Sequence, residues 1–281
     1  MAVQVRPYQP QSDYDSVSRF LIDVYEPTDR LLNWLQPRWE YMHHHPFIED
    51  VPLETIAVFE DGNQIVGLAH PEDKLAFVYF QRRRGYDHIL PAMFAHSAEH
   101  FGGPSVMLER DIIGLFINDF DSELQSVAES FGYERHPEYH DGYSKFDLAQ
   151  PIPDSPVPTD FRIQSLAEEN DHRKINRCLW LGFDHEGEIP EEEAAAPAVA
   201  QSAPNFRLDH TIVAVDSHGD YVSYAGIWHV PENGLAYVEP VATDPLYRRK
   251  GLGRACVFES LRRVQAEGAT VAWVGSDQEF Y

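Results

Sequence analysis

The stretch Leu235–Arg263 constrains the fold more than any other part of the chain. It opens with strand-forming residues, Ala236–Ala242, interrupted at Pro240, and continues through a Thr-Asp-Pro turn into a basic, glycine-spaced loop. After the loop, apolar residues recur every three to four positions, which predicts an amphipathic helix. A strand, a glycine-rich turn and a helix in this order predict an α/β fold with the loop at a helix N-terminus.

The loop combines two glycines with several cationic side chains. Its candidate ligand-binding residues are Arg248, Arg249, Lys250, Gly251, Gly253 and Arg254. The first turn of a helix has N–H groups without partners and a partial positive charge, and glycine lets an anion approach them closely. We therefore predict that this loop binds a polyphosphate. The alternative is a basic turn that only caps a surface helix.

The type of phosphate ligand follows from the longer pattern. The loop lacks the Lys-Ser/Thr ending of a nucleotide-binding P-loop and the three glycines of the dinucleotide fingerprint. The run Arg248-x-x-Gly251-x-Gly253-Arg254-Ala255, after a strand and Asp244-Pro245-x-Tyr247, resembles the acetyl-coenzyme A (acetyl-CoA) motif of the GNAT superfamily of N-acetyltransferases. The resemblance implies that loop amides hold the pyrophosphate of coenzyme A. It also implies that the preceding strand, with Val241 and Ala242, lies beside the pantetheine arm.

The chain shows one order of elements twice: strand, helix, hairpin, strand, basic loop, helix, strand. Residues 1–149 and 161–281 each follow this order, and residues 150–160, with four prolines, read as an extended linker. A strand at Tyr143–Leu148 is expected to end the first half. This looks like two GNAT domains in tandem, similar to mycothiol synthase and its relatives. The resemblance implies an α/β (α+β) fold in which each domain is a mixed, mostly antiparallel twisted sheet flanked by helices.

The first half looks like a degenerate GNAT domain. Asp87 stands where the second loop has Gly253, which puts a carboxylate at the expected pyrophosphate site. Family members carry a tyrosine four residues before a Gly-Phe pair, and the matching position here is Ala128. We expect a non-catalytic structural partner. Arg82, Arg83 and Arg84 either hold coenzyme A weakly or form a solvated turn.

Catalytic candidates lie on the strand before the loop. Pro240 removes a ladder hydrogen bond, which makes the backbone N–H of Val241 a candidate donor to the thioester carbonyl. Glu239 is the candidate base for the amine proton, if burial raises its pKa. A solvated strand glutamate is the alternative to that role. His229, on the neighbouring hairpin strand, is a second candidate base or a packed pocket residue.

Tyr281 matches the family's general-acid tyrosine, because Phe280-Tyr281 resembles the Phe-Tyr pair that precedes the last helix. The Gly-Phe, that helix and two further strands are absent from the sequence. We expect a second domain truncated at its C-terminus, with an open sheet edge at residues 270–274. A truncated gene or a second chain that supplies strands, as in a homodimer, would explain this.

The charge limits the partners. Asp and Glu total 46 against 22 Lys and Arg, for a net charge of −24. A field this negative repels nucleic acid and anionic membranes. It suits a cationic amine substrate or a salt-rich cytoplasm. Six of the 22 basic residues lie between Arg248 and Arg263, which agrees with an anionic cofactor there.

The remaining sequence features indicate an ordinary cytoplasmic protein. No signal peptide or membrane span is predicted, and two cysteines cannot make a disulfide framework. Adjacent side chains diverge in His43-His44-His45, and no cluster completes a zinc set around His96 and His100. We expect no metal site.

The predicted activity is transfer of an acetyl group from acetyl-CoA to a primary amine of a small molecule or peptide, in a direct ternary complex. The alternative is a non-catalytic acyl-CoA-binding or regulatory module.

Overall fold

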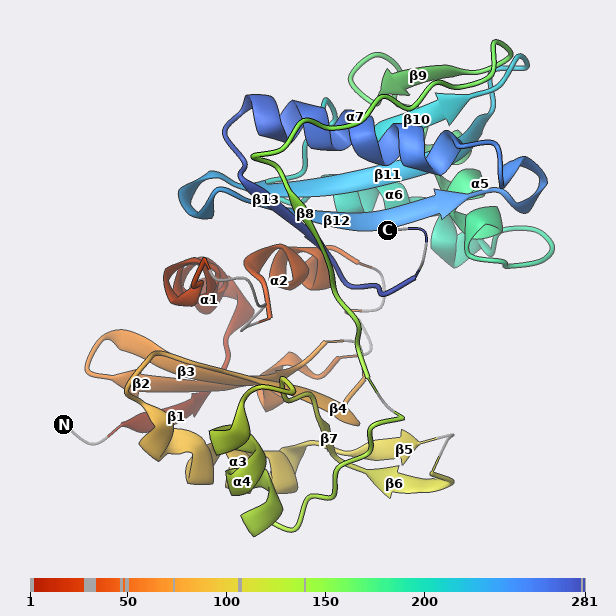
Figure 1. The fold of residues 1–281 in the computed structure, drawn as a ribbon. Coiled ribbons are helices and arrows are strands. Elements are labelled where there is room, and N and C mark those ends of the chain that lie inside the picture. Colours follow the sequence, from red (N-terminus) through yellow and green to blue (C-terminus); the bar gives the residue numbers. More distant parts are fainter. Residues whose placement is uncertain are drawn as a thin grey trace. The chain divides into compact units, whose positions relative to one another are not determined.

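The computed structural model describes residues 3–27, 34–45, 48, 51–72, 74–105, 108–138, 140–278 and 280. The chain divides into two compact units (Figure 1). Unit 1 comprises Met1–Met42 and Phe47–His140, and unit 2 comprises His43–Pro46 and Asp141–Tyr281. None of the helices described is long and apolar enough to cross a membrane.

Unit 1 is built on a five-stranded sheet in the order β1-β2-β3-β4-β7, in which only the β4–β7 pair is parallel. The strands are β1 (Gln4–Pro7), β2 (Ala57–Asp61), β3 (Gln64–Pro71), β4 (Phe77–Arg82) and β7 (Gly114–Leu115). The helices are α1 (Pro10–Val24), α2 (Gln36–His43), α3 (Leu90–His100) and α4 (Ser122–Ser130), with 3-10 turns at Leu53–Thr55 and Asp87–Ile89.

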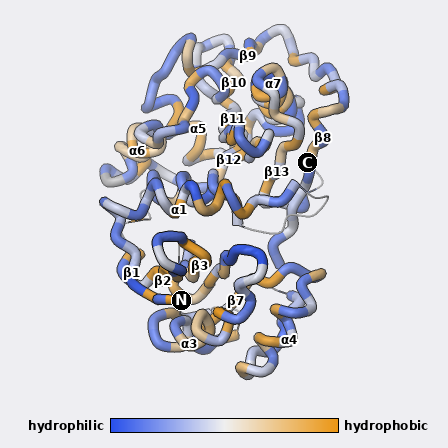
Figure 2. Tube along the Cα trace, turned by 90° about the vertical axis from the view of Figure 1, so that its left-hand side faces the viewer, coloured by the Kyte–Doolittle hydropathy of each residue, from blue (hydrophilic) through white to orange (hydrophobic). Residues whose placement is uncertain are grey.

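The core of unit 1 follows strand alternation, because successive side chains of a strand point to opposite faces. Phe59 and Phe80 pack with α3 and α4 on one face. Val58 and Leu68 pack with α1 and α2 on the other. Helix α1 alternates hydrophobic and hydrophilic residues along its length (Figure 2), as a helix covering one face of a sheet must.

Unit 2 is built on a six-stranded sheet in the order β8-β13-β12-β11-β10-β9. The strands are β8 (Ser144–Asp147), β9 (Arg162–Ser165), β10 (Ile212–Val215), β11 (Tyr221–Val230), β12 (Leu235–Thr243) and β13 (Val271–Val274). The helices are α5 (His172–Gly182), α6 (Ala196–Gln201) and α7 (Leu252–Ala266), with 3-10 turns at Glu191–Ala195, Pro231–Asn233 and Pro245–Tyr247.

Helix α7 covers one face of this sheet, and α5 covers the other (Figure 1). Along β10, Ile212 and Ala214 belong to the α7 side, whereas Val213 and Val215 belong to the α5 side. All ten residues of β11 are buried, so this strand is the centre of the unit. The strand, loop and helix predicted for Leu235–Arg263 are formed as β12, the loop and α7.

The structure corrects the placement of one predicted strand. The strand expected to end the first half forms as β8, but it pairs antiparallel with β13 in unit 2. It therefore covers the sheet edge that was expected to be open at residues 270–274. A separate hairpin of β5 (Gly103–Ser105) and β6 (Arg110–Ile112) lies outside the five-stranded sheet, and β7 pairs with β4.

The proline-rich segment 150–160 lies inside unit 2, after β8 and before β9. Ile152 and Val157 from this segment pack against the core under α7. Arg262 of α7 also donates to the Pro153 carbonyl at 2.6 Å. The segment is thus part of the packing of α7, and the division between the units falls earlier, at residues 140/141.

Candidate active site

Strand β12 loses its neighbour on one side part-way along its length. Parallel pairing with β13 covers Leu235–Tyr237, and the last pair joins Tyr237 to Trp273. β12 itself continues to Thr243. Within the described ranges no strand pairs with this side of β12 beyond Tyr237. The second half of β12 can therefore offer backbone groups to a ligand.

β12 also bulges where β13 leaves it. Glu239 and Pro240 together face the single residue Gly226 of β11, and the peptide bond between them is cis. A Cβ atom at Gly226 would lie 2.4 Å from the Glu239 carbonyl oxygen, so only glycine permits this approach. The indole Nε1 of Trp228 donates to the same carbonyl at 3.0 Å. The sequence prediction missed Gly226 and Trp228, although a glycine within a strand pattern often marks a bulge.

The direction of the Val241 amide follows from the antiparallel ladder. Asp244 N–H donates to Val222 O on β11, at 3.1 Å. Successive residues of a strand point their backbone groups to opposite sides. Val241, three residues before Asp244, therefore points its N–H toward the side that β13 has left. The side chain of Glu239 is half-buried in the bulge, and Ala242 is buried beyond it.

The glycine-spaced loop has the backbone of an anion-binding nest. Arg249 has φ +66° and Gly251, the N-cap of α7, has φ +78°, so left-handed residues alternate along the loop. The N-cap of α7 has no side-chain hydrogen bond. In the part of the chain that is described, the amides of residues 249–254 donate to no protein acceptor. The loop therefore presents a row of backbone donors, as an anion requires.

The loop's cationic side chains divide into two kinds. Arg248 is engaged by the protein: it donates to Thr243 O at 3.1 Å and Gly182 O at 2.8 Å, and pairs with Asp184 at 2.8 Å. Arg249, Lys250 and Arg254 are exposed and have no ion-pair partner among the residues described. Arg248 therefore fixes the end of β12, and the other three cations remain available to a ligand.

The turn before the loop is held in place by two aspartates. The Asp244 side chain accepts from Leu246 N–H at 2.9 Å. The hydroxyl of Tyr247 donates to Asp216 at 2.9 Å, and this hydrogen bond raises the pKa of Tyr247. Tyr247 thus anchors the loop to the hairpin turn between β10 and β11.

The segment after β13 runs back to the loop. Ser144 of β8 donates to the Ser276 carbonyl at 2.7 Å, which fixes the start of this segment. A Cβ atom at Gly253 would lie 3.1 Å from Thr243 Oγ1 and 3.2 Å from Phe280 Cζ, so glycine leaves room for the Phe280 ring beside the first turn of α7. Tyr281, the predicted general acid, lies outside the described residues.

The corresponding loop of unit 1 is closed by its own contacts. Arg82 donates to Asp87 at 2.7 Å, and Arg83 donates to Ile65 O at 2.8 Å. Ile89 N–H donates to Tyr86 O at 3.0 Å, so an amide at the start of α3 already has an acceptor. Ala128, at the position of the family's tyrosine, is buried in the core. That unit 1 is not catalytic stays a prediction.

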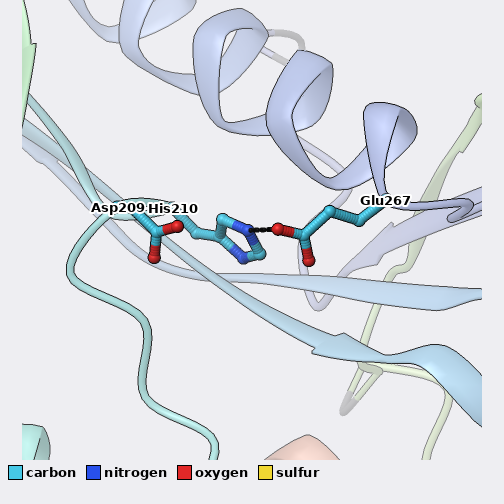
Figure 3. Close-up of side chains that lie close together, drawn as sticks. All are labelled: Asp209, His210 and Glu267. Atoms are coloured by element: carbon cyan, nitrogen blue, oxygen red, sulfur yellow. Dashed lines mark hydrogen bonds and ion pairs between the residues drawn. The ribbon is translucent and has the colours of Figure 1, made fainter.

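His229 lies away from the loop, at the other end of α7. Its Nδ1 is 3.6 Å from Glu267, which follows the C-terminus of α7, and burial lowers its pKa. Glu267 also accepts from His210 Nε2 at 3.0 Å, and Figure 3 shows His210 between Glu267 and Asp209. The ion-pair partner of His229 therefore belongs to this cluster, away from the bulge at Glu239.

Asp209, His210 and Glu267 are residue types that can bind a metal, and their ligand atoms lie within 4.8 Å of one another. The cation between the two carboxylates is Arg207, which donates to Asp209 at 2.7 Å and to Glu267 at 2.9 Å. The same guanidinium lowers the pKa of Asp209 to about 2. We interpret the cluster as a structural ion network. His96, one of the histidines considered in the sequence, bonds to Thr55 O at 2.7 Å.

One protein family matches the second half of the chain. Residues 172–281 match the sequence model of the acetyltransferase (GNAT) family. Unit 2 therefore resembles a GNAT domain in sequence. The matched residues include α5, the bulge of β12, the glycine loop and α7. The loop amides and the three cations without an ion-pair partner have the chemistry that phosphate groups require.

Solved structures extend the likeness to the whole chain at the level of fold. A GCN5-related N-acetyltransferase from Sphaerobacter thermophilus is 12% identical, with a TM-score of 0.57, and the match covers 97% of this chain and 85% of that one. A tandem GNAT protein from the clavulanic acid biosynthesis pathway is 13% identical, with a TM-score of 0.56, covering 99% and 91%. No curated protein sequence matches the chain. The predicted fold class, two tandem GNAT-like domains, is confirmed.

Proposed function

We propose that unit 2 transfers an acetyl group from acetyl-CoA to a primary amine of a small molecule or peptide within a ternary complex. One observation carries this proposal: the amides of residues 249–254 have no acceptor in the described protein, at the first turn of a helix beside the broken strand β12. The GNAT family match supports acyl transfer from acetyl-CoA in general. The net charge of −24 favours a cationic acceptor.

We assign the loop amides of residues 249–254 to the pyrophosphate of the cofactor, together with Arg249. We assign the strand segment at Val241 and Ala242 to the pantetheine arm. Arg248 acts indirectly in this proposal, because its guanidinium already joins Thr243 O to Gly182 O. These hydrogen bonds hold the end of β12 in a fixed position beside the loop.

The chemistry needs a polarised carbonyl, a neutral amine and a proton for the leaving group. Acetyl-CoA, when bound, supplies an acetyl thioester for attack by the amine nitrogen. Val241 N–H donates a hydrogen bond to the carbonyl oxygen as negative charge develops there. The Glu239 carboxylate accepts a proton from the amine, directly or through water. Tyr281, by its resemblance to the family's tyrosine, donates a proton to the departing thiolate.

Binding and turnover test separate parts of this proposal. Calorimetry with coenzyme A should show one site per chain, because unit 1 keeps its loop closed. Thiol release from acetyl-CoA should depend on an added amine, assayed over a panel of amines. Binding without release for any amine would support the non-catalytic module.

Glu239→Gln should lower kcat about 100-fold or more, the usual contribution of a general base. Glu232→Gln, on the exposed turn between β11 and β12, is the matched control and should leave kcat unchanged. Unchanged kcat in Glu239→Gln would remove Glu239 from the mechanism.

A further inference from the structure

Two cations of the glycine loop extend onto one neighbouring segment, residues 150–161. The Lys250 ammonium lies 4.9 Å from the ring centre of Tyr247 and 5.4 Å from that of Phe161. Arg254 Nε donates to Ser155 Oγ at 3.2 Å. Lys250 and Arg254 thus hold positions defined by residues outside the loop itself.

The segment that receives them is fixed against α7. Phe161 packs with the core under that helix and meets Tyr247 edge-to-face at 5.9 Å. Arg262 donates to the Pro153 carbonyl at 2.6 Å, and Gln265 donates to the Gln150 carbonyl at 3.2 Å. The segment therefore forms a wall beside the loop.

Neither cation is neutralised. Lys250 and Arg254 have no carboxylate partner in the described residues, although the chain has 46 acidic residues. Aromatic faces and a serine hydroxyl orient the two side chains without cancelling their charge. Both side chains remain able to bind an anion.

Coenzyme A carries phosphate at two places, the pyrophosphate and the 3′-phosphate of its adenosine. One nest of loop amides can enclose only one of these groups. We propose that Lys250 and Arg254, held on the segment 150–161, form a second anion subsite that binds the 3′-phosphate and selects coenzyme A over 3′-dephospho-coenzyme A. This inference rests on the proposed function of the loop.

The other loop arginines differ from this pair in a testable way. Arg248 is held by Gly182 O, Thr243 O and Asp184. Arg249 is left-handed within the nest itself, with φ +66°. Loss of the Arg249 side chain should weaken the binding of coenzyme A and of 3′-dephospho-coenzyme A in equal proportion, because both ligands contain the pyrophosphate. Arg249→Asn is the suitable variant, since asparagine tolerates a left-handed backbone.

The experiment is calorimetry of the full chain with coenzyme A and with 3′-dephospho-coenzyme A, at one fixed low salt concentration. The native chain should prefer coenzyme A about tenfold, as two partly exposed phosphate contacts would give. The double variant Lys250→Ala/Arg254→Ala should lose this preference, with its affinity for the dephospho ligand changed less than about twofold. Arg173→Ala, an exposed charge on α5, should keep the preference.

Equal affinity of the native chain for the two ligands would overturn the subsite. The subsite would also be overturned if the affinity of the double variant fell by the same factor for both ligands. If the native chain binds neither ligand, the proposed function fails as well, and this result is distinct from equal binding of both.

Discussion

At the scale of single residues, the site depends on small side chains that let backbone segments approach. Gly226 admits the bulge of β12, and Gly253 leaves space for Thr243 and Phe280 beside α7. The larger functional groups, Glu239 and the Val241 amide, are positioned by this backbone. A methyl group added at one of these glycines should therefore lower the activity without contacting any reacting group.

Gly226→Ala tests this dependence. The new Cβ would lie 2.4 Å from a backbone oxygen, which cannot move aside as a flexible side chain can. We expect a loss of about 1–3 kcal/mol in the stability of unit 2 and a fall of about tenfold in kcat/KM, from denaturant unfolding and steady-state kinetics. Gly103→Ala is the control, because the nearest atom to its Cβ would lie 3.6 Å away.

The Arg207 network gives a pH-dependent prediction. Hydrogen bonds from Arg207 lower the pKa of Asp209 from 3.8 to about 2, so the folded state binds fewer protons than the unfolded state between these values. The stabilisation is complete above about pH 4 and is lost as the pH falls toward 2. Arg207→Met should therefore cost roughly 1 kcal/mol at pH 7, since the guanidinium is partly exposed.

Denaturant unfolding of both proteins between pH 7 and pH 3 measures this difference. The cost of Arg207→Met should shrink as the pH falls below about 4. A cost that stays constant over the whole range would assign Arg207 a packing role instead of an electrostatic one.

At the scale of elements, the sequence predicted helices and strands where capping residues, glycines and hydrophobic periodicity lie within the segment itself. Helix α4 (Ser122–Ser130) begins after Asp121, a typical N-cap residue, and β12 and α7 form where the strand residues and the helical periodicity predict them. The location of β8 was not predictable in this way. Its sequence indicates a strand, but nothing in Ser144–Asp147 names the partner, because pairing depends on distant backbone groups.

The candidate site shows the same division. The glycines and cations of the loop could be identified from the sequence because they lie within one short segment. The contacts that distinguish Arg248 from Lys250 and Arg254 involve Gly182, Ser155 and Phe161, which are far away in the sequence. Only a folded chain brings these groups together.

Phe146→Ala tests the assignment of β8 to unit 2. Phe146 lies opposite Ala272 of β13 and meets Phe258 of α7 at 6.0 Å between ring centres. The substitution should destabilise unit 2 by roughly 2 kcal/mol, about half the cost at a fully buried phenylalanine. Hydrogen exchange should quicken in β13 and stay unchanged in β2 and β3. Faster exchange confined to β4 and β7 would return the strand to unit 1.

At the scale of the whole molecule, the charge and the site make opposite demands. The chain carries a net charge of −24, yet its proposed cofactor is an anion. Repulsion among carboxylates destabilises the folded state at low salt, and the same salt that screens it also weakens phosphate contacts.

Raising NaCl from about 0.05 to 1 M should therefore change two quantities in opposite directions, because the Debye length falls to about 3 Å. The midpoint of thermal unfolding should rise, and the affinity for coenzyme A should fall, as measured by calorimetry at each concentration. A thermal midpoint that falls with salt would show that favourable ion pairs, such as those of Arg207, outweigh the net repulsion.

The pairing of β8 with β13 also sets an order of events during synthesis. β8 leaves the ribosome before every other strand of its sheet, and its partner is the last strand of that sheet to be made. The nascent chain must therefore carry a partnerless strand until β13 has been made, and long-range pairing of this kind is slow. We therefore expect expression of the folded protein to depend on chaperones that protect β8 during this delay.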